Sequence, residues 1–302
     1  MKKITLILFA SILSTHLMAS DAVKDTTWYT KYESALGFSQ TSFTNWSAGG
    51  ENALALNGML NIYKNYAKGK VSWDNYLGLA YGVNFQQTDP KMRKTIDKIN
   101  FLTKGGIFAW KHWDYTGLFE FKSQFAQGFN YPNDSVYISK FMAPGYFQLS
   151  IGLNYKPVNY FSVFISPIGA RLTVVNDAQL TNRVDEKGNL IGAFGVKGDN
   201  STLWQIGGSL NAVFKKDIMK NVNYMSKLDL FSDYRHNPLN IIVGWENNVL
   251  MKVNKYLSLT FTSMLIYDDN IKYTDKEGNT HGPRTQFRET FTIGFAYTLE
   301  HK

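Results

Sequence analysis

The chain has 302 residues, a formal net charge of +8 and no cysteine, and 15% of its residues are aromatic. The lack of cysteine excludes disulfides and thiolate chemistry, and no basic cluster of the kind that binds nucleic acid is present. Mean hydropathy is slightly negative, at −0.25, so the aromatic residues must alternate with polar ones rather than form long apolar blocks. Outside the N-terminus, no run approaches the roughly 18 apolar residues of a membrane helix.

Residues 1–19 have the pattern of a secretory signal. Lys2 and Lys3 form a basic start, residues 4–13 are an apolar core, and Ala19 or Ser20 is a small residue suited to cleavage. We therefore expect an exported protein whose remaining residues, 20–302, form a single domain.

About twelve segments after the signal alternate between apolar and polar residues, which predicts β-strands with one apolar and one polar face. An early one, 52–62, places Leu54, Leu56 and Leu60 opposite Asn57 and Met59. The most regular is 147–155, and the last is 287–299, in which only Glu289 interrupts the apolar row. A soluble sandwich shares this alternation, but it buries the apolar face, whereas a membrane barrel turns that face outward.

The connections between these segments alternate in length, and this favours the membrane barrel. The short connections are expected at 64–70, 111–114, 156–159, 215–221 and 252–255. The long ones are expected at 40–50, 86–95, 127–145, 176–200, 234–240 and 268–285. Bacterial outer-membrane barrels combine short periplasmic turns with long outer loops. We therefore predict an all-β, transmembrane, antiparallel up-and-down barrel of about twelve strands.

The polar faces of the predicted strands carry charges of both signs. These residues are Lys31, Glu33, Asp74, Lys98, Lys104, Glu120, Lys122, Lys227, Asp229, Asp233 and Glu246. Unpaired charge away from water is costly, so the residues are expected to pair within a lumen that side chains largely fill. A selectivity lining for a small polar solute is the alternative.

Several long connections contain residues suited to closing the lumen or to contacting a partner protein or glycan. The candidates are Trp46, Gly49 and Gly50 between the first two strands, Tyr131, Tyr137 and Phe141 in 127–145, and Phe194 in 176–200. The two glycines also fit a tight hairpin turn, and the two longest loops also fit ordered loops that pack on each other.

An enzymatic site has weak support in the sequence. Asp233, His236, Asp268, Asp269 and His281 fall on one predicted rim, where a His–Asp couple and paired carboxylates can activate water. Asp268, Asp269 and Asp275 also suggest a calcium site. Loops are rich in such residues, and no nucleophile elbow, phosphate loop or zinc spacing occurs. We therefore assign no catalytic residue, metal or cofactor.

A set of short motifs resembles landmarks of an uncharacterised family of outer-membrane β-barrel-like proteins from Gram-negative bacteria of the Bacteroidetes type. The motifs occur at 45–52, 141–147, 155–157, 166–167, 192–195, 237–240 and 267–269. The resemblance implies an outer-membrane barrel and carries no known reaction. The chain departs from the family at its end, where residues 299–302 extend past the usual terminal aromatic residue.

The expected function follows from these observations. We expect a barrel in the outer membrane, in contact with its lipid, with no nucleic-acid partner. Its expected role is structural or that of an accessory subunit, in contact with other outer-membrane or cell-surface proteins. A channel for a small polar solute is the first alternative, and a hydrolase acting at the rim is the second.

Overall fold

The computed structural model describes residues 27–41, 53–86, 91–131, 134–185, 187–254, 256–274 and 280–301. Within these ranges, no helix is long and apolar enough to cross a membrane. The predicted signal segment lies outside the described residues.

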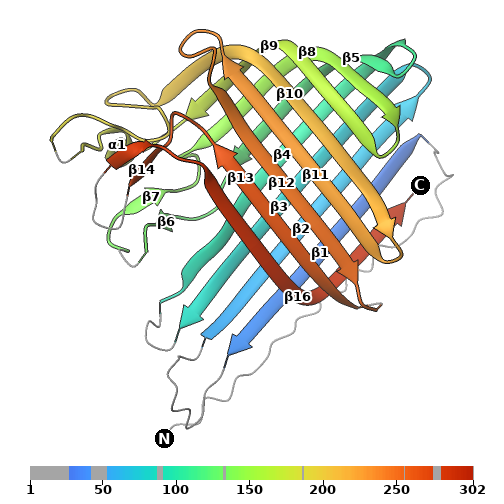
Figure 1. Cartoon of the computed structure of the whole chain (residues 1–302), viewed down its shortest axis with the longest axis horizontal. Helices are drawn as coiled ribbons and strands as arrows, with labels where there is room; N and C mark the ends of the chain where they lie inside the picture. Colours follow the sequence, from blue (N-terminus) through green and yellow to red (C-terminus); the bar gives the residue numbers. More distant parts are fainter. Residues whose placement is uncertain are drawn as a thin grey trace, which may run out of the picture.

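Twelve long antiparallel strands form a closed barrel (Figure 1). The strands are β1 (Trp28–Thr41), β2 (Ala53–Lys68), β3 (Val71–Gln86), β4 (Arg93–Trp110), β5 (Trp113–Ser123), β8 (Gly145–Val158), β9 (Phe161–Val174), β10 (Thr202–Met219), β11 (Val222–Asp233), β12 (Ile241–Lys252), β13 (Leu257–Tyr267) and β16 (Gln286–His301). Each pairs with its neighbours in chain order, and β16 closes the ring against β1. The predicted fold class and strand number are confirmed.

The two ends of the barrel differ in the length of their connections. At one end, called the turn end, strands are joined by pairs of residues such as 69–70 and 111–112, whereas residues 124–144 and 175–201 span the other, called the loop end. Gly69, His112 and Asn221 have φ values of 58°, 67° and 65°. Such positive φ values belong to the tight hairpin turns that match the twist of paired strands. The strands run further into the expected short connections than the pattern suggests, since β2 continues to Lys68.

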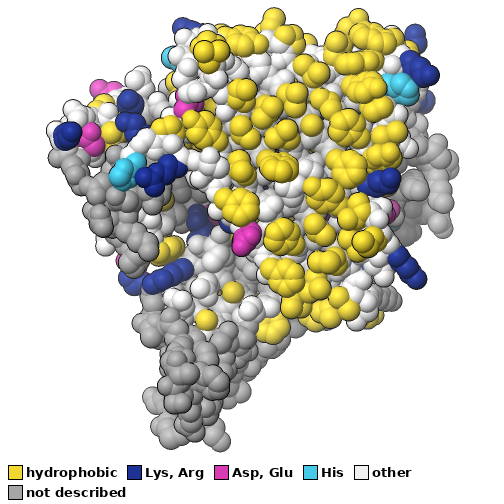
Figure 2. Space-filling view, viewed as in Figure 1, with side chains coloured by type: hydrophobic (Ala, Val, Ile, Leu, Met, Phe, Trp, Pro, Cys, Tyr) yellow, Lys and Arg dark blue, Asp and Glu magenta, His cyan; other side chains and the backbone are white. Residues whose placement is uncertain are grey.

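The barrel is apolar outside and polar inside. Ile151 and Ile168 on the outer face are each 70% exposed, whereas Ser150 and Asn154 on the inner face are each 1% exposed. Figure 2 shows apolar side chains covering the barrel face formed by β10 to β13 and β16. A soluble protein would not expose such an area to water. This inversion is the arrangement of a transmembrane barrel.

Aromatic residues gather at the turn end, where a membrane barrel meets the interface. Trp110 stacks on Trp113 with ring centroids 5.8 Å apart, and Trp113 lies 4.8 Å from Tyr155. On neighbouring strands, Trp28 and Tyr66 are 5.0 Å apart. Rings of this kind anchor a barrel at the boundary between hydrocarbon and water.

A bulge in β9 decides which of its side chains enter the lumen. The register against β8 and β10 shifts around Pro167, which has no backbone N–H to donate. The extra residue changes the inward parity, so Phe164 on one side and Arg171 on the other both face inward, opposite Asn211 and Gln205 of β10. The bulge therefore places the apolar Phe164 in the lumen on its turn-end side and the cationic Arg171 in the lumen on its loop-end side.

The loop end contains small elements that the alternating pattern did not predict. They are β6 (Gly128–Phe129), β7 (Tyr137–Ser139), α1 (Ala178–Thr181), β14 (Lys272–Thr274) and β15 (Thr280–Pro283). Ala143, Val175, Leu180, Ala193 and Val196 form a buried apolar cluster among these loops, with Tyr137, Phe194 and Leu203 packed against it. This cluster and its loops are called the loop cap.

Candidate functional site: the lumen and its loop-end cavity

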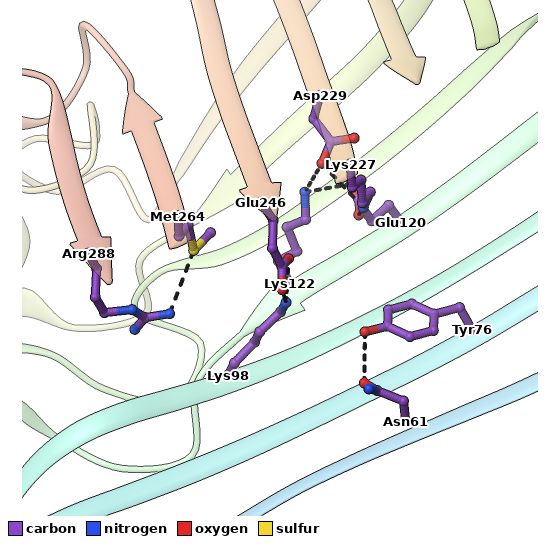
Figure 3. A network of polar contacts seen from close by, with 10 residues as sticks. All are labelled: Asn61, Tyr76, Lys98, Glu120, Lys122, Lys227, Asp229, Glu246, Met264 and Arg288. Carbon is purple, nitrogen blue, oxygen red and sulfur yellow. Dashed lines mark hydrogen bonds and ion pairs between the residues drawn. The ribbon is translucent and has the colours of Figure 1, made fainter. Parts of the chain in front are cut away.

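An ion pair joins opposite walls of the barrel at mid-lumen. Lys98 of β4 and Glu246 of β12 approach to 2.7 Å between Nζ and Oε2. In the ring of twelve strands, β4 and β12 stand six places apart, so the two side chains meet across the full width of the lumen (Figure 3). The pair spans the middle of the barrel.

A second group of charges links β5 to β11 beside this pair. Lys227 Nζ lies 2.8 Å from Glu120 Oε1, and Lys122 Nζ lies 3.2 Å from Asp229 Oδ2. Lys122 also contacts Glu120 at 2.9 Å, and Asn211 donates a short hydrogen bond to Asp229. Each charge has more than one partner, so these residues form a connected network, as Figure 3 shows.

Further ion pairs cross the lumen nearer the turn end. Lys215 of β10 contacts Glu33 of β1 at 3.2 Å. Lys156 of β8 contacts Asp74 of β3 at 2.8 Å. Lys31 bonds to Glu33 at 3.0 Å and to Glu300 at 2.9 Å. Lys156 and Lys215 were expected in turns, but both continue the inward parity of their strands.

Lys104 and Asp233 differ from the other nine predicted lumen charges. Lys104 is buried and donates a hydrogen bond to Asn154 Oδ1 at 3.3 Å. It forms no ion pair within the described part of the chain. Asp233 sits at the rim, where it accepts hydrogen bonds from Gln205 Nε2 and the Arg235 backbone N–H, at 3.1 and 3.0 Å.

Two apolar side chains add to the filling of the lumen. Phe164 and Leu118 point inward and are 1% and 3% exposed. They occupy polar-face positions of their strands, opposite Asn154 and Lys104 respectively. The sequence pattern did not single them out, although an apolar residue in an otherwise polar row was the available signal.

Above the network, a cavity of about 960 Å³ occupies the loop-end half of the barrel. Its lining mixes charged residues of both signs with apolar ones. Arg171 spans one wall, bonding to Asp268 Oδ2 at 3.0 Å and stacking over the Tyr146 ring at 4.8 Å. The charged floor includes Lys98 and Glu246. The volume falls within the range of small-molecule sites.

The loop cap beside this cavity is held by Asp177. Its carboxylate accepts a hydrogen bond from Tyr137 Oη at 2.8 Å, pairs closely with Lys140 and caps α1 by accepting from the Leu180 N–H at 3.1 Å. Burial raises the pKa of Asp177, but the hydrogen bonds from Lys140, Tyr137 and Leu180 outweigh burial and hold the pKa below its usual range.

The predicted loop residues lie in different places. Phe194 packs on the loop cap, and Phe141 is exposed. Tyr131 accepts a hydrogen bond from the Lys94 N–H at 3.3 Å, and the Arg93 guanidinium lies over its ring. The remaining three candidates, Trp46, Gly49 and Gly50, lie outside the described residues.

The rim carboxylates are engaged in local contacts. Asp233 Oδ2 lies 2.7 Å from His236 Nδ1, so the expected His–Asp couple is present. Asp268 is held by Arg171, and Asp269 accepts from Asn240 Nδ2 at 2.8 Å. In the described ranges, no group of three or more acidic or histidine residues is placed to hold a metal ion. Asp275 lies outside those ranges.

Comparison with known protein families finds a match over part of the chain. Residues 38–129 match a family described as a protein of unknown function (DUF3078), which confirms the expected resemblance to an uncharacterised family over that part of the chain. No curated protein matches the sequence.

Several solved barrels are similar in architecture. The translocator domain of the autotransporter NalP from Neisseria meningitidis is 11% identical, over 90% of this chain and 88% of that one, with a TM-score of 0.36. The NanC porin is 11% identical, over 88% of this chain and 100% of the porin, with a TM-score of 0.40. An outer-membrane channel (COG4313) from Pseudomonas putida F1 is 7% identical, over 93% and 100%, with a TM-score of 0.36. The protein is a closed, twelve-stranded transmembrane β-barrel, and its residues 38–129 resemble a family of unknown function.

Proposed function

We propose that the protein resides in the outer membrane as a barrel whose lumen is closed at rest, and that it serves as a structural or accessory subunit there. The observation that carries the closed lumen is the pairing of Lys98 with Glu246 across opposite walls. The neighbouring pair of Lys227 and Glu120 supports it. A conducting pore needs a continuous wet path, and side chains tied together across the lumen interrupt one.

The cross-lumen pairs also resist opening. Each charge loses hydration when it enters the lumen, and its partner compensates for that loss only while the pair is intact. Moving Lys98 away from Glu246 would leave two uncompensated charges between the barrel walls. The resting state is therefore the paired and closed one.

The test of the closed lumen is single-channel conductance of the purified mature protein in a planar bilayer. We expect no steady current from the natural sequence. The double variant Lys98→Ala, Glu246→Ala should conduct, because it removes the pair that spans the lumen. The matched control is Lys91→Ala, Asp134→Ala, which removes an ion pair outside the lumen and should stay silent.

Heat-modifiable gel mobility would show that each variant is folded. A steady, salt-dependent current from the natural protein would reject the closed lumen. Silence from the folded lumen variant would show that other groups, such as Phe164, close the barrel instead.

The accessory role rests on the loop cap. An ordered loop with its own buried apolar cluster presents a fixed surface at the loop end, and exposed Val184 and Leu190 belong to it. Such surfaces suit protein contacts. Since the chain has no cysteine, Val184→Cys can be cross-linked in whole cells, and we expect a defined second protein to be captured. Recovery of the uncross-linked barrel alone would contradict this role.

A channel for a small polar solute is the second candidate, favoured by the charged lining of the loop-end cavity. It requires a continuous wet path through the lumen, which would pass ions as well as the solute. Liposome swelling with sugars or amino acids at the natural sequence would favour it over the closed barrel.

A further inference from the structure

The seam between the first and last strands of the barrel is paired over only part of its length. In β1, Thr30–Gly37 pairs with β16 from His301 to Gly294. The preceding part of β16, Gln286–Phe295, pairs with β13 on its other edge. Residues 286–293 therefore have a strand neighbour on one edge only within the described ranges. Figure 1 shows β1 and β16 diverging toward the loop end.

Two glycines stand where the strands part. A Cβ at Gly37 would overlap the Thr292 side chain, and a Cβ at Gly294 would overlap the Leu36 carbonyl. Gly37 and Gly294 are also the last paired residues of the seam. The close approach fixes the point of divergence, and beyond it Phe38–Thr41 and β16 are unpaired with each other among the residues that the structure describes.

The open part of the seam adjoins the loop-end cavity. Gln286 and Arg288 of the half-paired segment line that cavity. Phe287 and Phe291, on the opposite face of the same segment, belong to the outer apolar surface and are 63% and 60% exposed. Irregular or unpaired backbone at membrane depth is tolerated where it lines a wet cavity. In Figure 2, a hollow containing Lys or Arg side chains borders the apolar face.

The cavity beside this opening offers guanidinium groups and apolar surface. Arg288 contacts Met264 Sδ at 3.7 Å, and Arg183 lies in the loop above; neither contacts a carboxylate among the residues that the structure describes. Ile266 and Phe194 line the same space. Guanidinium groups bind carboxylates and phosphates through paired hydrogen bonds.

We propose that this cavity binds an anionic amphiphile, with its head group at Arg288 and Arg183, and that the molecule enters from the membrane through the open seam between β1 and β16. A lipid-facing entrance suits a ligand that partitions into the bilayer. The mixed lining suits a ligand with one charged end and one apolar chain. Arg288 is paired in register with Met264, and Met264 with Glu246, so the site borders the Lys98–Glu246 pair. Binding there does not require that pair to separate.

The first test measures binding to the full mature protein in phosphatidylcholine nanodiscs, with empty nanodiscs as the blank. The probe is 11-(dansylamino)undecanoic acid, compared with its methyl ester and with dansylglycine. We expect saturable binding of the acid, with the uncharged ester and the chainless anion each at least about tenfold weaker. Equal binding of the acid and dansylglycine would indicate a site for small anions and would overturn the proposal.

Variants assign the head-group site. Arg288→Gln and Arg183→Gln should each weaken binding of the acid about tenfold, equivalent to about 1.4 kcal/mol, and leave the ester unchanged. The matched control, Lys252→Gln, removes an exposed cation at the turn end. It should change binding of neither the acid nor the ester. Equal loss in all three folded variants would reflect net charge alone and would contradict the assignment.

A second test addresses the route and does not depend on the arginines. Phe38→Cys with Ile293→Cys places thiols on either side of the open seam, and Leu36→Cys with Phe295→Cys places them across its paired part. A disulfide should form readily in the second pair, because partners in a sheet lie within its reach. The first pair should need a longer bismaleimide.

Bridging the open seam should slow association of the dansyl acid about tenfold or more, whereas the disulfide in the paired part should not. Unchanged association after complete bridging would exclude this route. Capture of a second polypeptide by Ile293→Cys in whole cells, without saturable dansyl acid binding, would assign the seam to a partner strand and overturn the proposal.

Discussion

The charged side chains of the lumen differ in how well they are compensated. Lys227 has carboxylate partners in Glu120 and Asp229, at 2.8 and 3.2 Å. Lys104, equally enclosed, has only a neutral amide oxygen within hydrogen-bond reach among the described residues. Removing one member of a buried pair leaves the other uncompensated, whereas removing a lone buried charge relieves its desolvation cost.

We therefore expect opposite results from the same substitution at these two positions. Lys227→Met should lower the free energy of unfolding by about 3 kcal/mol, and Lys104→Met should raise it by about 1 kcal/mol. Urea unfolding in lipid vesicles, followed by tryptophan fluorescence, measures both. A loss of stability in Lys104→Met as large as that in Lys227→Met would show that Lys104 has compensation beyond Asn154.

At this scale the sequence predicted which charges face inward, because parity along a strand decides the face. It did not predict their partners. Lys98 and Glu246 are separated by 148 residues and meet because β4 and β12 stand opposite in the ring. That geometry depends on strand number and stagger together, and the sequence of a single strand predicts neither.

At the scale of elements, the strands followed from alternation, and the loop cap did not. Short elements such as α1 have too few residues for a periodic signal. The helix is held instead by Asp177, whose partners Tyr137 and Lys140 come from another loop. Only contacts between distant segments define such a structure.

The loop cap should loosen in acid. The pKa of Asp177 is lowered in the folded protein relative to its ordinary value of 3.8. The carboxylate therefore contributes stability above the ordinary value, and this contribution is lost as the pH falls through the lowered folded value. Hydrogen exchange of residues 176–185, corrected for intrinsic rates, should rise below about pH 4.

Two variants separate the charge from the helix cap. Asp177→Asn keeps an oxygen for the Leu180 N–H and should abolish the pH dependence while retaining part of the protection. Asp177→Ala should lose both the pH dependence and the protection from exchange. Asp199→Asn, at an exposed position of the same loop, is the control. A pH dependence that persists in Asp177→Asn would assign it to another group.

At the scale of the whole molecule, the exposed apolar belt defines the solvent in which the fold is stable. Ile151 lies mid-strand on that belt, and Leu239, 93% exposed, lies in a loop beyond it. Ile151→Arg should lower the free energy of unfolding in lipid vesicles by about 2–4 kcal/mol, whereas Leu239→Arg should have little effect. Equal effects of the two substitutions would mean that lipid does not cover the belt.

The partial pairing of β1 with β16 also has a consequence for how the barrel unfolds. The ring closes where β1 meets β16, through the pairing of residues 294–301 with β1. By comparison, β2 pairs with β3 along the whole of Ala53–Lys68 and Val71–Gln86. That pairing is about twice as long as the pairing of β1 with β16. The strand pairing that completes the cylinder is thus among the shortest in the barrel and, on this geometry, the first to separate when the barrel is heated.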